Sequence, residues 1–231
     1  MLRTALVDVG GTLWPELGPP TDRQERRLQD EVGLDGLQTS QVVHALNRAI
    51  STWESPTVLE QDTDGLIRKV LGRLHIKGVD ERSVREAMCV PASDGATLFS
   101  EAPQLLRDIA GLGLRTILVS NTAWRDTNVY RRDFEYFGMS EHIDTIITSL
   151  EVGFRKPHSA IFRAALDAAQ CSPSDCVFLG DSEEKDIRPA FRQGMRSILV
   201  AIERPAPLHS AADAVATSLS QVTGILQAWM K

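Results

Sequence analysis

The sequence predicts an α/β fold in which a parallel sheet is covered by helices on both faces. The chain opens on a short apolar strand, Thr4 to Val7, which is followed at once by Asp8. From Phe99 onward, short apolar runs alternate with amphipathic helical stretches, and this alternation is typical of βαβ units. Between the two parts, from about Trp14 to Ser93, the apolar residues recur only at helical spacing. The chain therefore combines a doubly wound sheet with a small helical segment.

The helical segment contains four amphipathic stretches. The first begins at Thr21, which can cap a helix together with Gln24 three positions later, a capping-box arrangement. The others open at Ser40, Thr63 and Ser83, each followed by apolar residues at helical spacing. Four such helices predict a small bundle.

The alternating segment supplies the rest of the sheet, because each helix there leads into a new apolar run that ends at polar or glycine residues. Crossovers between its parallel strands should be right-handed. The expected strands are Arg115–Ser120, Ile143–Thr148, Cys176–Leu179, Ser197–Ala201 and a weak one near Ala214–Thr217. The expected helices are Ala102–Ala110, a polar and Arg-rich stretch after Ser120, Ser159–Ala169, Lys185–Gln193 and a terminal helix with Val222, Ile225, Leu226 and Trp229. Ser159 is expected to cap the helix that it opens.

Composition excludes several classes of protein. A hydrophobic content of 42% and a charged content of 24% are those of an ordinary globular chain of 231 residues. The net charge of -6 argues against a nucleic-acid surface. No stretch approaches the ~20 apolar residues of a membrane span, and a strand so near the first residue leaves no room for a signal peptide. We expect a cytoplasmic protein whose cysteines, Cys89, Cys171 and Cys176, are reduced.

Four short segments carry polar residues near the predicted strand ends: 8–13, 118–122, 153–157 and 178–186. Three of them run on from a predicted strand, and 153–157 lies just before the predicted helix at Ser159. In this order and spacing they resemble the motifs of the haloacid dehalogenase superfamily, most of whose members are Mg-dependent phosphatases. The resemblance implies a Rossmann-like core with strand order 3-2-1-4-5 and a helical cap inserted after the first strand. We therefore expect the core to span residues 1–14 and 94–231 and the cap to span residues 15–93.

The strand-end residues suit phosphoryl transfer through a covalent intermediate, which needs a nucleophile and a counter-charge. Asp8 would be the nucleophile, Ser120 can donate its hydroxyl to a phosphoryl oxygen, and Lys156 provides positive charge. Asp181 ends the fourth strand and converges with Asp8, and two carboxylates that close repel unless a cation joins them. Oxygen ligands favour a hard metal, Mg²⁺ first.

The resemblance adds further residues to this site. The family's third protein ligand to the metal is the backbone carbonyl at Gly10, and Asp186 would complete the metal site by orienting Lys156 or a metal-bound water. Asp186 could instead be an ordinary charge near a helix N-terminus. Residues expected to contact substrate are Gly11, Thr12, Trp14 and Asn121. Asn121 could instead only cap a helix, and the rings of Trp14 and Trp124 could belong to the core.

Gly10 departs from the phosphatase pattern. Phosphatases of the family carry a second Asp at this position, which protonates the leaving alkoxide and then deprotonates the attacking water. A positioned acid or base contributes typically ~10²–10⁴-fold in rate. We expect a slow phosphatase unless the substrate is an acyl or aryl phosphate, which needs no acid, or the cap supplies a substitute. His44 is a candidate substitute, although a surface role suits it better, as it does for Arg131, Arg132 and the run Arg23–Arg27.

Three other functions stay open. A pseudo-enzyme would bind a phosphorylated ligand or partner with little turnover. Phosphonoacetaldehyde hydrolases also lack the second Asp, but they use a cap Lys, and the cap has only Lys69 and Lys77. The 2-haloacid dehalogenases lack the metal-binding Asp that Asp181 preserves. The sequence favours a Mg-dependent phosphatase of a small phosphorylated metabolite, acting as a monomer or homodimer, with no nucleic-acid or membrane partner.

Overall fold

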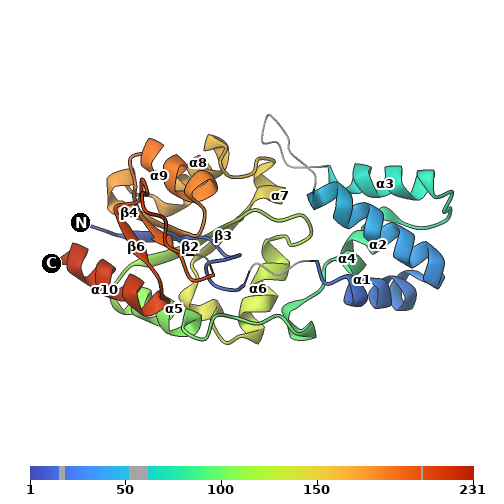
Figure 1. The fold of residues 1–231 in the computed structure, drawn as a ribbon, viewed down its shortest axis with the longest axis horizontal. Helices are drawn as coiled ribbons and strands as arrows, with labels where there is room; N and C mark the ends of the chain where they lie inside the picture. Colours follow the sequence, from blue (N-terminus) through green and yellow to red (C-terminus); the bar gives the residue numbers. More distant parts are fainter. Residues whose placement is uncertain (16–18, 52–61, 204) are drawn as a thin grey trace.

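The centre of the molecule is a parallel sheet in the order β3-β2-β1-β4-β5-β6 (Figure 1). The computed structural model describes residues 1–15, 19–51, 62–203 and 205–231. The predicted order 3-2-1-4-5 is confirmed, and the weak sixth strand extends the sheet beside β5. The strands are β1 Thr4–Val7, β2 Arg115–Ser120, β3 Thr145–Thr148, β4 Cys176–Gly180, β5 Arg196–Val200 and β6 Ala214–Ala216.

The register of β1 places its carboxyl end between two neighbours. Val7 pairs with Leu118 of β2 on one side and with Leu179 of β4 on the other, both in parallel. Asp8 follows Val7 directly, so it lies beside the ends of β2 and β4. In open parallel sheets this carboxyl edge is where ligands bind.

Helices cover both faces of the sheet because successive side chains of a strand point to opposite sides. Ala5 and Val7 belong to a hydrophobic cluster with α5, α6 and α10, whereas Leu6 belongs to a second cluster with α8 and α9. These helices are α5 Ala102–Gly111, α6 Thr127–Tyr136, α8 Ser159–Ala169, α9 Arg188–Arg192 and α10 Leu219–Met230. Shorter segments are α7 Ser149–Val152, the 3₁₀ turns Ala92–Asp94, Ser140–His142 and Pro173–Asp175, and the π-helical Glu183–Ile187. The doubly wound architecture is thus confirmed.

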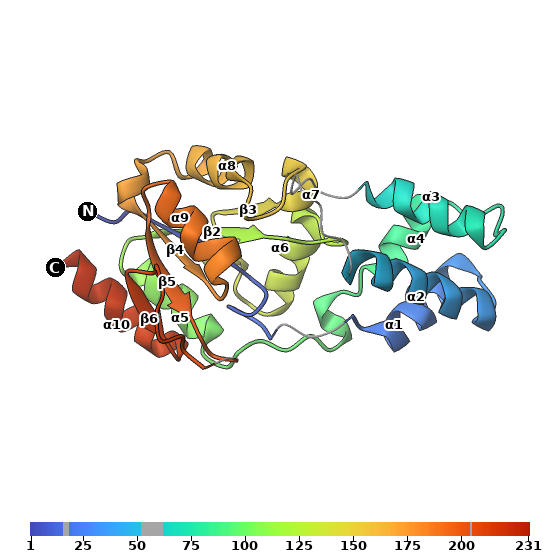
Figure 2. The same cartoon turned by 45° about the horizontal axis from the view of Figure 1, so that its top comes forward.

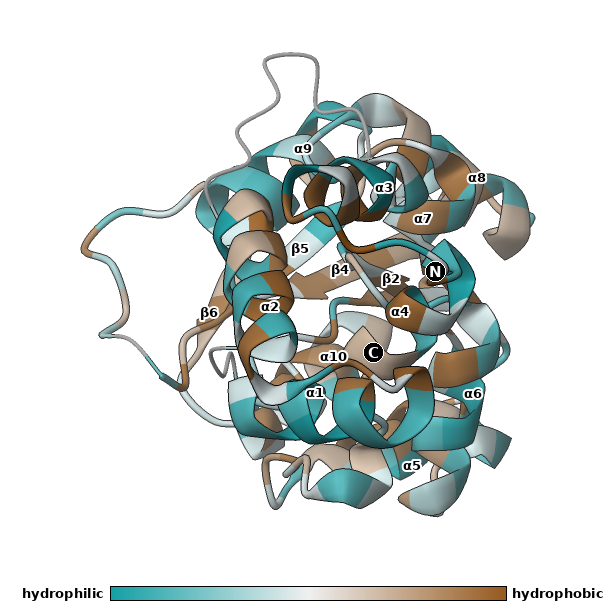
Figure 3. Cartoon of the chain, turned by 90° about the vertical axis from the view of Figure 1, so that its right-hand side faces the viewer, coloured by the Kyte–Doolittle hydropathy of each residue, from teal (hydrophilic) through white to brown (hydrophobic). Residues whose placement is uncertain are grey.

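Four helices form a separate group, which lies beyond the carboxyl edge of the sheet (Figure 2). They are α1 Thr21–Arg27, continued by the π-helical Leu28–Val32, α2 Gly36–Ser51, α3 Thr63–Arg73 and α4 Glu81–Met88. Their apolar faces meet in a hydrophobic cluster of their own. Figure 3 shows that the residues of α1 are hydrophilic. We call α1–α4 the helical group.

Side chains of α1 tie the end of α4 into the helical group. The last carbonyls of a helix lack intrahelical partners. Gln24 Nε2 donates to Met88 O at 3.0 Å, and Arg27 Nε donates to Ala87 O at 3.0 Å. The interpretation of Arg23–Arg27 as a solvated face is therefore wrong for Arg27, which closes α4. Among the described residues, no helix has the length and apolar run needed to cross a membrane.

Several helix starts differ from the sequence prediction. The capping box at Thr21 does not form, because Thr21 is already inside α1 and its hydroxyl donates to Pro19 O. Helix α2 begins at Gly36, ahead of Ser40. Helix α8 is capped by His158 rather than by Ser159, because the extended backbone of His158 lets its Nδ1 accept from the Ala160 amide at 3.1 Å.

Candidate active site

Asp8, Lys156 and two further carboxylates meet at the carboxyl edge of the sheet. Lys156 Nζ lies 2.6 Å from Asp8 Oδ1 and 2.8 Å from Asp186 Oδ1. Asp8, Lys156 and Asp186 are all buried. Asp8, Asp181 and Asp186 each offer one oxygen, and these three oxygens lie within 4.8 Å of one another. The structure thus brings together four residues that the sequence assigned to nucleophile, counter-charge and metal site.

Burial and repulsion between like charges shift the pKa values of this cluster. Burial raises the pKa of Asp8 from 3.8 to about 7; Lys156 opposes this rise, and the charges of Asp186 and Asp181 add to it. Burial alone would lower the pKa of Lys156, but Asp186 and Asp8 outweigh it and hold that pKa above its ordinary value. Asp8 and Asp186 thus share one ammonium group, and an oxygen of Asp181 lies within 4.8 Å of theirs. A divalent cation would relieve the repulsion among the three carboxylates, whose oxygens are the donors that Mg²⁺ prefers. These residues fit such an ion.

Two glycines allow the carboxylates to approach the loops. Gly11 has a φ of +73°, and a Cβ there would lie 2.6 Å from Asp181 Oδ2. A Cβ at Gly180 would lie 2.6 Å from atoms of the Asp186 side chain. Both positions must stay glycine for Asp181 and Asp186 to keep their places. The substrate contact predicted for Gly11 stays a prediction, and its visible role is to seat Asp181.

Gly10 leaves open space beside the cluster. A Cβ at this position would meet no heavy atom within 4 Å, and Gly10 is not among the glycines with positive φ. The backbone of Gly10 is therefore compatible with other residues. Neither the backbone angles nor the space at the Cβ position therefore requires glycine here.

Asn121 binds the backbone that carries Lys156. Its Nδ2 donates to Lys156 O at 3.0 Å, and its Oδ1 accepts from Lys156 N at 2.7 Å. This two-bond pairing joins the loop after β2 to the loop that precedes α8. Asn121 thus places Lys156 in front of Asp8 and does not cap a helix. A phosphoryl contact of Asn121 stays a prediction.

Ser120 and Thr12 are both buried next to this cluster, and they differ in hydrogen bonding. Ser120 Oγ lies 2.8 Å from the hydroxyl oxygen of the buried Tyr130. Thr12 Oγ1 has no hydrogen-bond partner among the described residues. The orphaned Thr12 hydroxyl is consistent with the predicted substrate contact but does not test it.

The tryptophans that follow the motifs pack in two different places. Trp14 stacks on Tyr130 and Phe134, with ring centroids 5.7 and 5.5 Å apart. Its ring therefore belongs to the aromatic core under the loop, which favours the core alternative for Trp14. Trp124 packs against the hydrophobic cluster of the helical group. His44 is exposed on α2, where its Nε2 faces Glu25 Oε1 at 4.0 Å, as suits a surface residue.

A second group of buried polar contacts joins the loop after β2 to the chain that returns from the helical group. Arg125 Nε lies 3.0 Å from Asp133 Oδ2, and Arg125 Nη2 donates to Val90 O. Asp133 Oδ1 accepts from the Ala92 amide at 2.8 Å. We call Arg125, Asp133 and the backbone of Val90 and Ala92 the linker joint. The sequence analysis missed it, because nothing in the local pattern links α6 to residues about 40 positions earlier.

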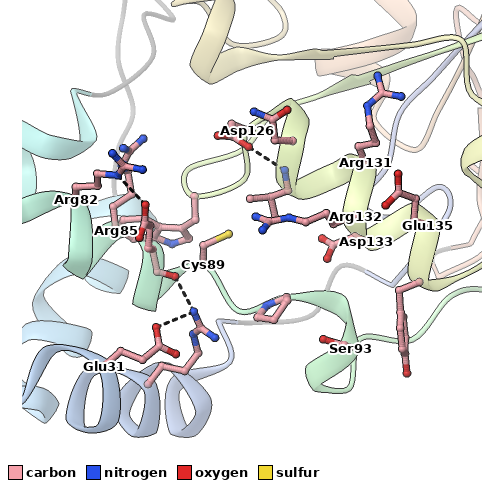
Figure 4. A pocket seen from close by; sticks show the side chains of 17 residues that line it. Glu31, Arg82, Arg85, Cys89, Ser93, Asp126, Arg131, Arg132, Asp133 and Glu135 are labelled. Carbon is pink, nitrogen blue, oxygen red and sulfur yellow. Dashed lines mark hydrogen bonds and ion pairs between the residues drawn. The ribbon is translucent and has the colours of Figure 1, made fainter.

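A cleft of about 930 Å³ opens on the outside of this joint, between α4 and α6 (Figure 4). Arg82 and Arg85 lie on one side of it, and Arg131, Arg132 and Glu135 lie on the other. Arg82 pairs with Glu86, and Arg85 with Asp64. None of the residues around Asp8 lines this cleft. Its charges are mixed in sign, so it does not form a cationic site for phosphate.

Sequence comparison places the chain in a family. A family model described as haloacid dehalogenase-like hydrolase matches residues 2–194. The chain belongs to this family of hydrolases. A glyceraldehyde 3-phosphate phosphatase of Methanothermobacter thermautotrophicus is 34% identical over 210 residues, which cover 88% of this chain and 87% of that protein.

Other relatives match over shorter stretches. Haloacid dehalogenase-like hydrolase domain-containing protein 3 of Bos taurus is 37% identical over 110 residues, 48% of this chain and 41% of that protein. A phosphoserine phosphatase of Thermus thermophilus is 31% identical over 103 residues, 45% of this chain and 40% of that protein. Both matches therefore span less than half of the relative's length.

Solved structures of the family share the whole fold. A 2-haloacid dehalogenase from Pseudomonas syringae superimposes with a TM-score of 0.70 at 21% identity, covering 99% of this chain and 100% of that one. A phosphatase of the family from Thermococcus onnurineus gives 0.66 at 18% identity, with 97% and 98% covered. One neighbour is a dehalogenase and the other a phosphatase, so the shared fold does not select between the two reactions.

Proposed function

We propose that this hydrolase is a Mg²⁺-dependent phosphatase of a small phosphorylated metabolite, acting through an aspartyl phosphate on Asp8. The observation that carries the proposal is the cluster of three carboxylates around one lysine, with their oxygens within 4.8 Å. A dehalogenase acts on no phosphoryl group, so it has no such charge for a metal to neutralise. A relative that matches nearly end to end is named a phosphatase, which agrees with this choice.

The residues divide the work of the reaction. In the first step Asp8 attacks phosphorus, an Asp8–phosphorus bond forms, and the bond from phosphorus to the leaving oxygen breaks. In the second step water attacks phosphorus and the Asp8 carboxylate leaves. Lys156 balances the charge of the phosphoryl oxygens, and Ser120 donates a hydrogen bond to one of them. A bound Mg²⁺, held by Asp8, Asp181, the Gly10 carbonyl and, directly or through a water, Asp186, would neutralise charge on the phosphoryl group.

The helical group is proposed as the cap of this enzyme, with residues 15–93 as cap and residues 1–14 and 94–231 as core. It lies beyond the edge that carries Asp8 (Figure 2). The group is joined to the sheet by two stretches of chain, one after β1 and one through the linker joint. A cap in this position would exclude water from the site and contact the part of the substrate that is not phosphate.

Gly10 narrows the substrate class. Because residue 10 has no carboxyl group, it cannot protonate the leaving oxygen. Acyl and aryl phosphates release an unprotonated leaving group far more readily than alkyl phosphates do. We therefore propose that acyl or aryl phosphates are turned over faster than alkyl phosphates.

Phosphate release from three esters, with Mg²⁺ and with EDTA, tests the proposal. Acetyl phosphate, p-nitrophenyl phosphate and glyceraldehyde 3-phosphate represent the acyl, aryl and alkyl classes. The expected result is Mg²⁺-dependent release in which the alkyl ester is slowest. Release that EDTA does not abolish would overturn the metal dependence. No release from any ester, together with Mg²⁺-dependent binding of inorganic phosphate, would favour the pseudo-enzyme.

A further inference from the structure

Tyr130 is a buried tyrosine in a place where phenylalanine would fill the same space. Its ring stacks on Trp14 and lies 6.3 Å from Phe134. Phe134 in the same stack supplies its aromatic surface with no hydroxyl. A buried hydroxyl costs free energy unless it is hydrogen-bonded. The hydroxyl of Tyr130 therefore requires an explanation beyond packing, and its neighbours provide one.

The hydroxyl of Tyr130 meets Ser120, a residue of the candidate site. The two hydroxyl oxygens lie 2.8 Å apart, and either could be the donor. Ser120 Oγ also donates to Asn121 O at 3.4 Å, and a hydroxyl has only one proton to give. Tyr130 is therefore the donor to Ser120.

This direction lets the proton of Ser120 turn toward the site. Its present acceptor, the carbonyl oxygen of Asn121, lies 3.4 Å away, which is long for a hydrogen bond of a hydroxyl. While Tyr130 donates to Ser120 Oγ, the Ser120 proton can exchange this weak acceptor for a phosphoryl oxygen. A phenol is also a stronger donor than an alkyl hydroxyl, which favours the same direction. Hydrogen bonds that run in one direction strengthen one another in a buried setting.

We propose that Tyr130 is a positioning residue, whose hydroxyl donates to Ser120 Oγ and thereby turns the Ser120 proton toward a phosphoryl group held at Asp8. Burial raises the pKa of Tyr130, with the positive charge of Arg125 opposing the rise, so the phenol keeps its proton at neutral pH. The inference rests on the proposed function, because it needs a phosphoryl group at Asp8. It adds a residue from α6 to a site built from strand ends, the loop before α8 and the π-helical segment Glu183–Ile187.

A double-mutant cycle between Tyr130 and Ser120 tests the proposal. Tyr130→Phe removes one oxygen and keeps the ring stack, and Tyr136→Phe is the matched control. Tyr136 is the other tyrosine of the chain and its side chain is exposed. Turnover of p-nitrophenyl phosphate and the affinity for orthovanadate, both with Mg²⁺, are measured for wild type, Tyr130→Phe, Ser120→Ala and the double variant. Thermal unfolding of each shows whether it is folded.

The expected result is a loss that depends on Ser120. Tyr130→Phe should lower kcat about tenfold with little change in KM, the size of one oriented hydrogen bond. The same change in the Ser120→Ala background should have no further effect, and Tyr136→Phe should match wild type. An equal loss in both backgrounds would show that Tyr130 acts apart from Ser120 and would overturn the proposal. Turnover of Tyr130→Phe equal to that of Tyr136→Phe would also overturn the proposal.

Orthovanadate separates this proposal from the proposed function. If wild type releases no phosphate but binds vanadate, the proposed phosphatase function is wrong. The double-mutant cycle can still be evaluated from the vanadate affinities of the four proteins. Weaker vanadate binding by Tyr130→Phe only when Ser120 is present then supports the positioning role. Equal affinities across the cycle overturn it. If Tyr130→Phe does not fold, Tyr130→Met removes the hydroxyl with a flexible apolar side chain, and the same dependence on Ser120 is expected.

Discussion

Two clusters of charged side chains contact the loop after β2. They differ in the number of carboxylates that each cation faces. In the linker joint, one carboxylate, Asp133, meets one guanidinium, Arg125, and backbone groups fill the remaining hydrogen bonds. At the carboxyl edge, Asp8 and Asp186 share the ammonium group of Lys156, and an oxygen of Asp181 lies within 4.8 Å of theirs. The first cluster pairs one carboxylate with one cation, whereas the second gathers three carboxylates, and the charges of Asp181 and Asp186 raise the pKa of Asp8.

The difference separates a structural joint from a binding site. A buried charge that has its partners stabilises the arrangement around it, and removing one partner is costly. A buried group of like charges costs stability until a cation arrives, and the fold keeps it where function requires it. Charge balance, more than burial or the number of ion pairs, distinguishes the two clusters.

The largest expected effect is at Asp8. Asp8→Asn keeps the shape of the side chain but removes the attacking charge, so phosphatase activity should fall on the order of 10⁴-fold or more, to background. Steady-state release from p-nitrophenyl phosphate measures it, with Asp30→Asn, an exposed carboxylate of the helical group, as control. Asp8→Asn with most of its turnover intact would mean that the covalent mechanism is wrong.

The second prediction uses the open space at Gly10. Gly10→Asp should raise turnover of alkyl phosphates by at most ~10²–10⁴-fold, because it restores an acid and base to both half-reactions. Aryl phosphates should gain in the second step only; the wild type should show a burst with these esters and Gly10→Asp should not.

Gly10→Asn is the matched control, since it has nearly the same size and cannot transfer a proton. The backbone at Gly10 is free of positive φ and a Cβ there meets nothing within 4 Å. Poor folding is therefore not expected to mask the result. Equal rates for Gly10→Asp and Gly10→Asn would show that the missing acid does not limit this protein.

The sequence predicts one cluster and not the other, for a physical reason. Parallel strands bring their carboxyl ends to one edge, so Asp8, Lys156 and Asp181 could be placed together from strand pattern and motif alone. The strand Arg115–Ser120 was predicted with its observed bounds. The pairing of Asn121 with the Lys156 backbone, the contact of Tyr130 with Ser120 and the linker joint depend on how loops pack, and no local periodicity encodes that.

Helix starts fail for a related reason. At Thr21 and at Ser159 a good capping residue lies next to the true cap, and the local backbone conformation decides between neighbours. Propensity ranks residue types for a cap but does not fix the dihedral angles that make one residue the cap. The same limit applies to Trp14. Its position after a motif does not indicate that its partly buried ring stacks on Tyr130 and Phe134, and its contact with substrate stays a prediction.

The third prediction concerns the linker joint. Asp133→Ala leaves Arg125 without its carboxylate and the Ala92 amide without its acceptor, so the free energy of unfolding should fall by about 3 kcal/mol. Urea denaturation measures the loss. Mg²⁺ affinity by calorimetry should be unchanged, since this cluster has no part in the site. Arg82→Ala, which breaks an exposed ion pair with Glu86, should shift the unfolding midpoint little. A large loss of Mg²⁺ affinity in Asp133→Ala would break the separation between the clusters.

The smallest expected effect is a gain of stability rather than a loss. It tests directly whether the two clusters differ in charge balance. Asp181→Asn removes one of three like charges while keeping a hydrogen-bonding side chain of the same shape. Repulsion from Asp181 is one of the causes that raise the pKa of Asp8, so relieving it should stabilise the metal-free protein. We expect Tm in EDTA to rise about 2 °C, the shift that roughly 0.5–1 kcal/mol gives a chain of this size.

The same Asp181→Asn variant should bind Mg²⁺ at least ~10- to 100-fold more weakly, the loss typical even of an outer-shell partner of a metal ligand. Added Mg²⁺ should therefore raise the Tm of wild type above that of Asp181→Asn, so that the order of the two proteins reverses with the metal. A reversal is what an unbalanced site predicts, since the charge that weakens the empty fold is the charge that holds the ion. If Asp181→Asn lowers Tm in EDTA, the cluster is a stabilising network like the linker joint. Charge balance would then no longer distinguish the two.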